Sequence, residues 1–192
     1  MGRFLGQFKI KKGDDRGATV VEAAMALPIL LLILIAIMEL GLAFKDYLTV
    51  SYISREGARI GALAGDDPEA DCAILRGIGE IVTTGDLQRI NRIEIYKSDA
   101  AGGQGVTNTA VYKPGQDPTL CTVPADPTDG WTLNSGPWPP TSRQTAVGTN
   151  PLDIIGVRVI LDRTWVSGLP PFSGGFQVNE STITRIEPEV FD

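Results

Sequence analysis

The chain contains no histidine and only two cysteines among its 192 residues. Without histidine it lacks the side chain that most often serves as a general base or metal ligand near neutral pH. A nucleophile and a histidine base therefore cannot be combined, and we expect neither a metal nor a cofactor. The composition argues against an enzyme. It does not exclude an active site made of two acidic side chains, as in glycosidases.

Basic residues are scarce outside the N-terminus. Residues 1–17 carry a net charge of +3, whereas the rest of the chain has 12 basic and 21 acidic residues, a net charge of −9. Binding to nucleic acid requires clustered Lys and Arg side chains that neutralise phosphates. We therefore expect no nucleic-acid partner for residues 44–192, and we expect no small-molecule substrate.

One long stretch lacks charge almost completely. Residues 23–38 carry none, and residues 18–43 are interrupted only by Glu22 and Glu39. As a helix, residues 18–43 would reach about 39 Å, which exceeds the ~30 Å of a bilayer core. A helix of a soluble domain would show a polar stripe, and this run shows none for four turns. The run predicts a single transmembrane helix with its basic N-terminus in the cytoplasm and residues 44–192 outside it.

A secretory signal peptide is the competing interpretation of the same residues. Gly41-Leu42-Ala43 has the small-x-small pattern of a signal-peptidase site, which would leave Phe44 as the mature N-terminus. The apolar run is longer than the usual core of such a peptide, and Glu39 lies next to the proposed cut. These features favour a retained anchor, in which Glu39 marks the helix exit and has no special partner.

A short motif precedes the apolar run. The basic leader ends at Gly17 and is followed by "ATVVE", which resembles the processing signal of type IV prepilins. More narrowly, "RGATVVEAAMALPILLLILIAIMELG" followed by "YISREGARIGALAG" is similar to the TadE-like proteins of the tight-adherence (Tad, or Flp) pilus systems. The matching features include Pro28 within the run and the E-x-G sequence that ends at Gly41. Because the mature chain is much longer than a major Flp pilin, the resemblance implies a minor pilin or pseudopilin.

The resemblance also implies roles for particular residues. A prepilin peptidase would cut between Gly17 and Ala18, and Glu22 would pair with a mature N-terminus of its own or an adjacent subunit. Residues four apart share one face of a helix, and a cation offsets part of the cost of a carboxylate at the membrane. Alternatively, Glu22 lies among lipid headgroups. The implied partners are the membrane, the prepilin peptidase, other pilins and Tad assembly-platform proteins.

Beyond the membrane the helix is expected to continue as far as Gly65. Residues 44–65 contain no proline, and they align Arg55 and Arg59 on one stripe with Leu48 and Tyr52. The two arginines either dock acidic groups of the domain or of a partner, or they lie on a solvated face.

The rest of the exported chain predicts a second helix and a small sheet. Asp67-Pro68 has the pattern of a helix start, and this helix is expected to run to about Val82 and to end at Gly85. Apolar alternation predicts antiparallel strands at 92–97, 153–162 and 181–187, with a short fourth at 109–113. Helices followed by such strands indicate an α+β fold.

A long insertion, residues 98–151, is predicted to be a loop because it holds eight prolines and seven glycines. Its Trp131 and Trp138 either form an exposed stacking platform for sugars or a partner, or fold back over a small core. Cys72 and Cys121 are the only cysteines. On the exported side of a membrane they predict a disulfide, which would pin the insertion to the second helix.

Two functional classes follow from these features. The favoured one is a membrane-anchored minor pilin or pseudopilin that takes part in assembly or capping of a Tad pilus. The alternative is a stand-alone membrane-tethered extracytoplasmic binding protein that uses the TadE-like helix only as an anchor. In both, the chain crosses the inner (cytoplasmic) membrane once and its C-terminal domain is extracytoplasmic; the pilin class would also occur in the extracellular pilus.

Overall fold

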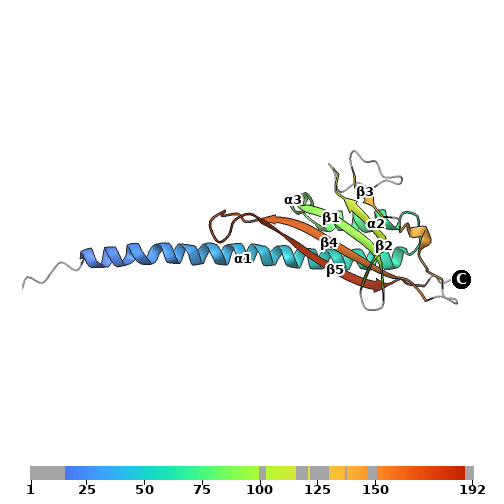
Figure 1. Cartoon of the computed structure of the whole chain (residues 1–192), viewed down its shortest axis with the longest axis horizontal. Helices are drawn as coiled ribbons and strands as arrows, with labels where there is room; N and C mark the ends of the chain where they lie inside the picture. Colours follow the sequence, from blue (N-terminus) through green and yellow to red (C-terminus); the bar gives the residue numbers. More distant parts are fainter. Residues whose placement is uncertain are drawn as a thin grey trace, which may run out of the picture.

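The computed structural model describes residues 16–99, 103–115, 121, 130–136, 138–146 and 151–188. One helix, α1 (Arg16–Ala64), dominates the chain with 49 residues. Its first half projects beyond the folded domain and its second half packs against it (Figure 1). The predicted membrane helix and its extension are therefore one continuous element, with Pro28 inside it. The helix ends where expected, at Gly65, whose φ of +58° suits a glycine.

The other helices are short. α2 (Ala70–Ile81) follows the turn after α1, and α3 (Thr84–Leu87) is a single turn. The predicted start at Asp67-Pro68 is early, because Asp67 stabilises a turn before α2. Its carboxylate accepts a hydrogen bond from the Glu69 N–H at 2.7 Å, and its carbonyl accepts one from the Ala70 N–H at 2.9 Å. Gly85 lies within α3 and does not end α2.

Five antiparallel strands form one sheet in the order β3-β2-β1-β4-β5. The central strand β1 (Ile90–Ser98) pairs with β2 (Gln104–Lys113) and with β4 (Ile154–Thr164). The edges are β3 (Thr132–Ser135) and β5 (Gly175–Arg185). This arrangement confirms the predicted α+β fold.

The predicted loop insertion contributes two strands to that sheet. The whole of β2 and the whole of β3 lie within residues 98–151, and a short 3-10 turn, Pro140–Ser142, follows them. The sequence does not predict β3, because "TLNS" contains a single large apolar side chain and no alternating pattern. Its pairing with β2, for example Tyr112 opposite Leu133, is what defines it.

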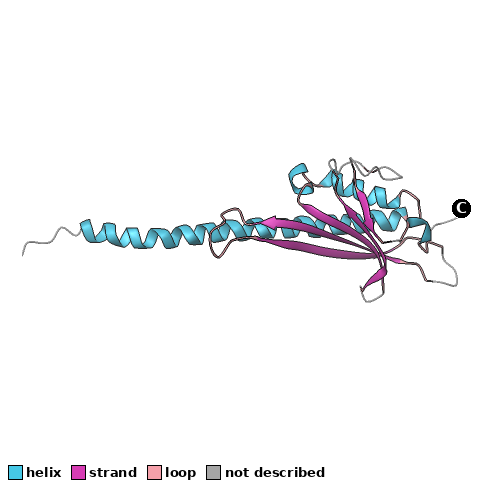
Figure 2. Cartoon of the chain, turned by 45° about the horizontal axis from the view of Figure 1, so that its top comes forward, coloured by secondary structure: helices cyan, strands magenta, loops and turns pink. Residues whose placement is uncertain are grey.

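The hydrophobic core lies between the sheet and the helices α1 and α2, and the sheet runs along the second half of α1 (Figure 2). As predicted, β4 turns alternate side chains to one side, and Ile155, Val157, Val159 and Leu161 are at most 1% exposed. α1 presents small residues there. A Cβ atom on Gly61 would lie 2.6 Å from Ile155 Cδ1 and 2.8 Å from Ile74 Cδ1. Glycine at this position lets α1, α2 and β4 approach closely.

Candidate functional site

The first part of α1 carries the residues predicted to act in processing and assembly. Gly17, Ala18 and Glu22 all lie in the helix, and every residue from Gly17 to Leu34 is exposed. Most of the basic leader, residues 1–15, lies outside the described residues. Within the described part of the chain, α1 is the one helix long and apolar enough to cross a membrane.

Glu39 has specific partners, which corrects the prediction that it only marks the helix exit. Its side chain is fully buried. Glu39 Oε1 accepts a hydrogen bond from the Ser167 N–H at 2.5 Å, and Oε2 lies 3.5 Å from Arg163 Nη2. Ser167 is 128 positions later in the chain. No local sequence signal connects residues so far apart.

A second buried carboxylate, Asp46, lies two helical turns after Glu39 and therefore on the same side of α1. Its Oδ2 accepts hydrogen bonds from Arg163 Nη1 at 2.5 Å and from Arg89 Nη2 at 2.6 Å. Burial raises the pKa of Asp46, but the hydrogen bonds from Arg89 and Arg163 outweigh it and hold the pKa below its usual value. Asp46 is therefore ionised at neutral pH.

Arg89 extends this network to α3. Its Nη1 donates to Asp86 Oδ1 at 3.0 Å, and Lys45 Nζ of α1 donates to Asp86 Oδ2 at 3.0 Å. We call these six residues the juxtamembrane clamp: Glu39, Lys45, Asp46, Asp86, Arg89 and Arg163. Its three carboxylates balance its three cations. Because a buried ion pair adds little net stability but is costly to break, the clamp mainly determines how α1 is oriented on the domain.

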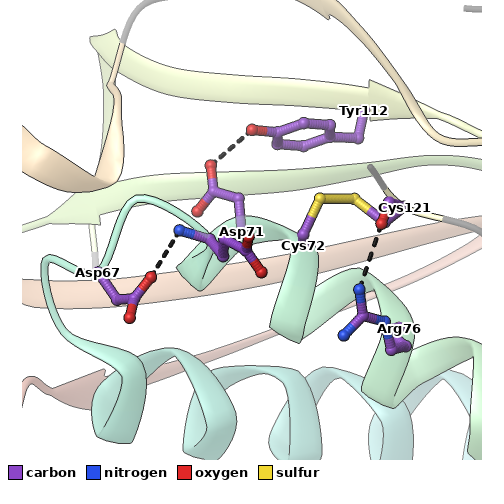
Figure 3. Close-up of a disulfide and its surroundings, with 7 residues drawn as sticks. Asp67, Asp71, Cys72, Arg76, Tyr112 and Cys121 are labelled. Carbon is purple, nitrogen blue, oxygen red and sulfur yellow. Dashed lines mark hydrogen bonds between the residues drawn. A yellow bond between two sulfur atoms is a disulfide. The ribbon is translucent and has the colours of Figure 1, made fainter. Parts of the chain in front are cut away.

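A separate set of contacts ties the insertion to α2 (Figure 3). Cys72 and Cys121 form the predicted disulfide, with their Cα atoms 5.4 Å apart. Beside it, Arg76 Nη2 donates to the Cys121 carbonyl at 3.2 Å, and the Tyr112 hydroxyl donates to Asp71 Oδ2 at 2.6 Å. Burial, reinforced by the Asp71 charge, raises the pKa of Tyr112, so its hydroxyl remains a donor.

Both tryptophans of the insertion are buried. Trp131 is 1% exposed and Trp138 is 4% exposed. Arg143 lies over the Trp138 ring, with Cζ 4.7 Å from the ring centroid, and forms a buried ion pair with Asp71. The tryptophans thus fold back over the core, as one of the two interpretations predicted, and they do not form an exposed stacking platform.

Arg55 and Arg59 are exposed on α1, on the same outward stripe as Leu48 and Tyr52. Arg59 pairs with Glu56 of its own helix. Their suggested contacts with a partner stay a prediction. Among the described residues, no group of three or more His, Cys, Asp or Glu side chains is arranged to hold a metal.

A long exposed apolar helix joined to a small α+β domain defines a protein that is anchored in a membrane by a single helix. Residues 17–59 match a family model described as TadE-like protein, so the resemblance expected from the sequence is confirmed over this segment. The segment includes Gly17, Glu22, Glu39 and Asp46 and ends within α1, before the sheet begins. No curated protein and no solved structure gives a match.

Proposed function

We propose that this protein is a membrane-anchored minor pilin or pseudopilin that takes part in assembly or capping of a Tad pilus. The observation that carries the proposal is the TadE-like match over residues 17–59, on a helix whose residues 17–34 are all exposed. Such a helix presents one continuous apolar surface. That surface suits lipid before assembly and the helices of neighbouring subunits after it.

The juxtamembrane clamp supports this role mechanically. A subunit moved out of the membrane by its helix must carry its domain in a defined orientation. Glu39 and Asp46 connect the helix to β4 through Arg163, at the level where the helix enters the domain. A rotation of α1 would withdraw both carboxylates from Arg163 and leave charges buried without partners, which is strongly unfavourable.

We further propose that a prepilin peptidase cleaves between Gly17 and Ala18, with the leader in the cytoplasm. Cleavage would create an ammonium group on Ala18, one helical turn from Glu22. Glu22 is exposed, so an N-terminus of a neighbouring subunit can also reach it. The pair would register subunits in the membrane while reducing the cost of the carboxylate there.

The test compares wild type, Glu22→Gln and a control, Glu80→Gln, which changes an exposed glutamate of α2. All are expressed in a host that carries a Tad apparatus. N-terminal sequencing of membrane-extracted protein is expected to begin at Ala18 in all three. Incorporation of Glu22→Gln into sheared pili is expected to fall about tenfold, because a polar contact between membrane helices contributes about 1–2 kcal/mol. Glu80→Gln is expected to assemble normally.

Two results would contradict the proposal. A mature N-terminus at Phe44 would assign processing to signal peptidase. A cleaved Glu22→Gln protein that assembles like wild type would leave Glu22 among the lipid headgroups. The alternative function is a tethered binding protein that uses the TadE-like helix only as an anchor, and for it the buried Trp131 and Trp138 offer no exposed stacking platform.

A further inference from the structure

The turn between β4 and β5, residues 165–174, lies beside the membrane helix, and we call it the hairpin tip. Figure 1 shows it extending along α1 toward the N-terminus, ahead of the rest of the folded domain. A groove separates it from the helix. The groove is lined by four apolar residues of α1 between Leu32 and Ala36 and by four apolar residues of the tip between Leu169 and Phe172.

The hairpin tip has the composition of a lipid-facing surface. Residues 164–179 contain no Asp, Glu, Lys or Arg, although 21% of the whole chain is charged. Val166 is 67% exposed and Leu169 is 48% exposed. Trp165 packs against Phe172 at 5.1 Å between ring centroids. Tryptophan side chains are enriched where a membrane meets water. A contiguous exposed apolar surface marks an interaction site, including a site of contact with a membrane.

The position of the groove along α1 puts the tip at bilayer depth. Leu32 and Ala36 lie 14 and 18 residues after Ala18. A hydrocarbon core of about 30 Å spans about 20 helical residues, so a core that begins between Ala18 and Glu22 ends between about residues 38 and 42. The groove therefore lies about 3–15 Å inside the outer boundary of the core at 1.5 Å per residue.

The backbone of the tip is suited to a region with little water. Pro170 and Pro171 have no N–H group to satisfy. The Trp165 N–H donates to the Gly174 carbonyl at 3.3 Å, and the Ser173 N–H donates to the Pro171 carbonyl at 3.2 Å. Glu39 accepts the Ser167 N–H. Lipid offers no acceptors, so the N–H groups of Trp165, Ser167 and Ser173 are satisfied in the way that insertion requires.

We propose that the hairpin tip is a second membrane-contact element, which inserts Trp165 and Leu169 into the outer leaflet and docks the domain on the bilayer beside its own anchor. Its partner is the phospholipid of the outer leaflet, from the headgroup boundary to the outer part of the acyl chains. Glu39 then lies between α1 and the tip, shielded from lipid by both. The proposal requires α1 to be in a membrane but no role in a pilus, so it stands or fails separately from the proposed function.

Full-length protein in phosphatidylcholine vesicles with brominated acyl chains tests this directly, because bromine quenches indole fluorescence at short range. Trp165 is the reporter, since Trp131 and Trp138 are buried in the domain core. We expect the emission to be lower in brominated than in plain vesicles. We expect Trp165→Phe to abolish that difference. Equal emission in the two lipids, or a difference that Trp165→Phe retains, would overturn the proposal.

A matched pair of variants locates the contact. Leu169→Asp adds a charge to the tip, and Leu133→Asp adds one on β3, where the leucine is similarly exposed (54% against 48%). We expect Leu169→Asp to lose the bromine quenching of Trp165 and Leu133→Asp to retain it. Far-ultraviolet circular dichroism checks that both are folded. Quenching that is absent at a high protein-to-lipid ratio and appears at a low ratio would mean that a second copy of the protein normally covers the tip. That result would also contradict the proposal.

Discussion

At the scale of single residues, the main feature is a pair of buried carboxylates on one side of α1. Glu39 and Asp46 are both buried and share Arg163 as a partner. A carboxylate transferred from water without a partner is costly, so both are stabilised by the arginine from β4, and Asp46 also by Arg89. Arg163 is itself only 5% exposed. These residues make the orientation of the helix depend on a distant strand.

We predict that Arg163→Met destabilises the folded domain by about 3 kcal/mol, the lower end of the cost of breaking a buried ion pair. The lower end applies because Arg89 still reaches Asp46. Denaturant unfolding of detergent-solubilised protein measures this change.

The control for that experiment is Arg59→Met, which removes an exposed arginine of α1 that pairs with Glu56. We expect a change of about 0–1 kcal/mol, as for other surface pairs. Adding Glu39→Gln and Asp46→Asn to Arg163→Met is expected to recover part of the loss, because no buried charge then lacks its partner. Equal effects of Arg163→Met and Arg59→Met would contradict the clamp.

At the scale of elements, α1 passes through two environments without interruption. Residues 17–34 are exposed and, apart from Thr19 and Glu22, apolar, whereas from Val50 onward one side of the helix is part of the domain core. The core side is lined by small residues, chiefly Gly57 and Gly61, which meet isoleucines of α2 and residues of β4 at short distances. The helix therefore acts both as the anchor and as the central packing element.

We predict that Gly61→Leu destabilises the domain by about 1–3 kcal/mol, the usual cost of overpacking a core. The added side chain would collide with Ile155 of β4 and Ile74 of α2. Gly41→Leu is the matched control in the same helix, since a Cβ atom there meets nothing within 4 Å. We expect no loss with Gly41→Leu. Thermal unfolding in detergent distinguishes the two, and a Gly61→Leu protein as stable as wild type would refute close packing at this point.

At the scale of the whole molecule, two sets of contacts hold the parts together. The clamp joins the helix to β4 and α3 where the helix enters the folded domain. The disulfide and the contacts around Asp71 join the insertion, with β2 and β3, to α2. One set orients the domain on its anchor, and the other completes the sheet.

We predict that replacing both Cys72 and Cys121 by serine lowers the stability of the domain by about 4 kcal/mol, the chain-entropy value for a loop of this length. The two cysteines are 49 positions apart. The loss is expected at the insertion, so limited proteolysis is expected to cut there first, while residues 16–64 stay anchored in the membrane. Non-reducing peptide mapping of wild type must show the linked peptides. Unchanged stability in the double variant would contradict a structural role for the bond.

Much of the candidate site could be predicted from local sequence. The continuous apolar helix, the glycine that ends it, the resemblance over the first helix and the strands β1, β4 and β5 all follow from patterns within a few residues of one another. The disulfide could also be predicted, because only two cysteines exist. The strand β3 could not, since its four residues are recognisable only by their pairing with β2.

The sequence by itself determined that this protein has one long apolar helix, an acidic chain after it and a TadE-like start, because composition and helical period act over neighbouring residues. Only the tertiary structure decided what Glu39 does, that Trp131 and Trp138 are buried, and where the hairpin tip lies. Each of these depends on contacts between residues far apart in the chain, such as Ser167 with Glu39. Packing of a strand and a turn against a helix selects those contacts, and packing has no local signature in the order of residues.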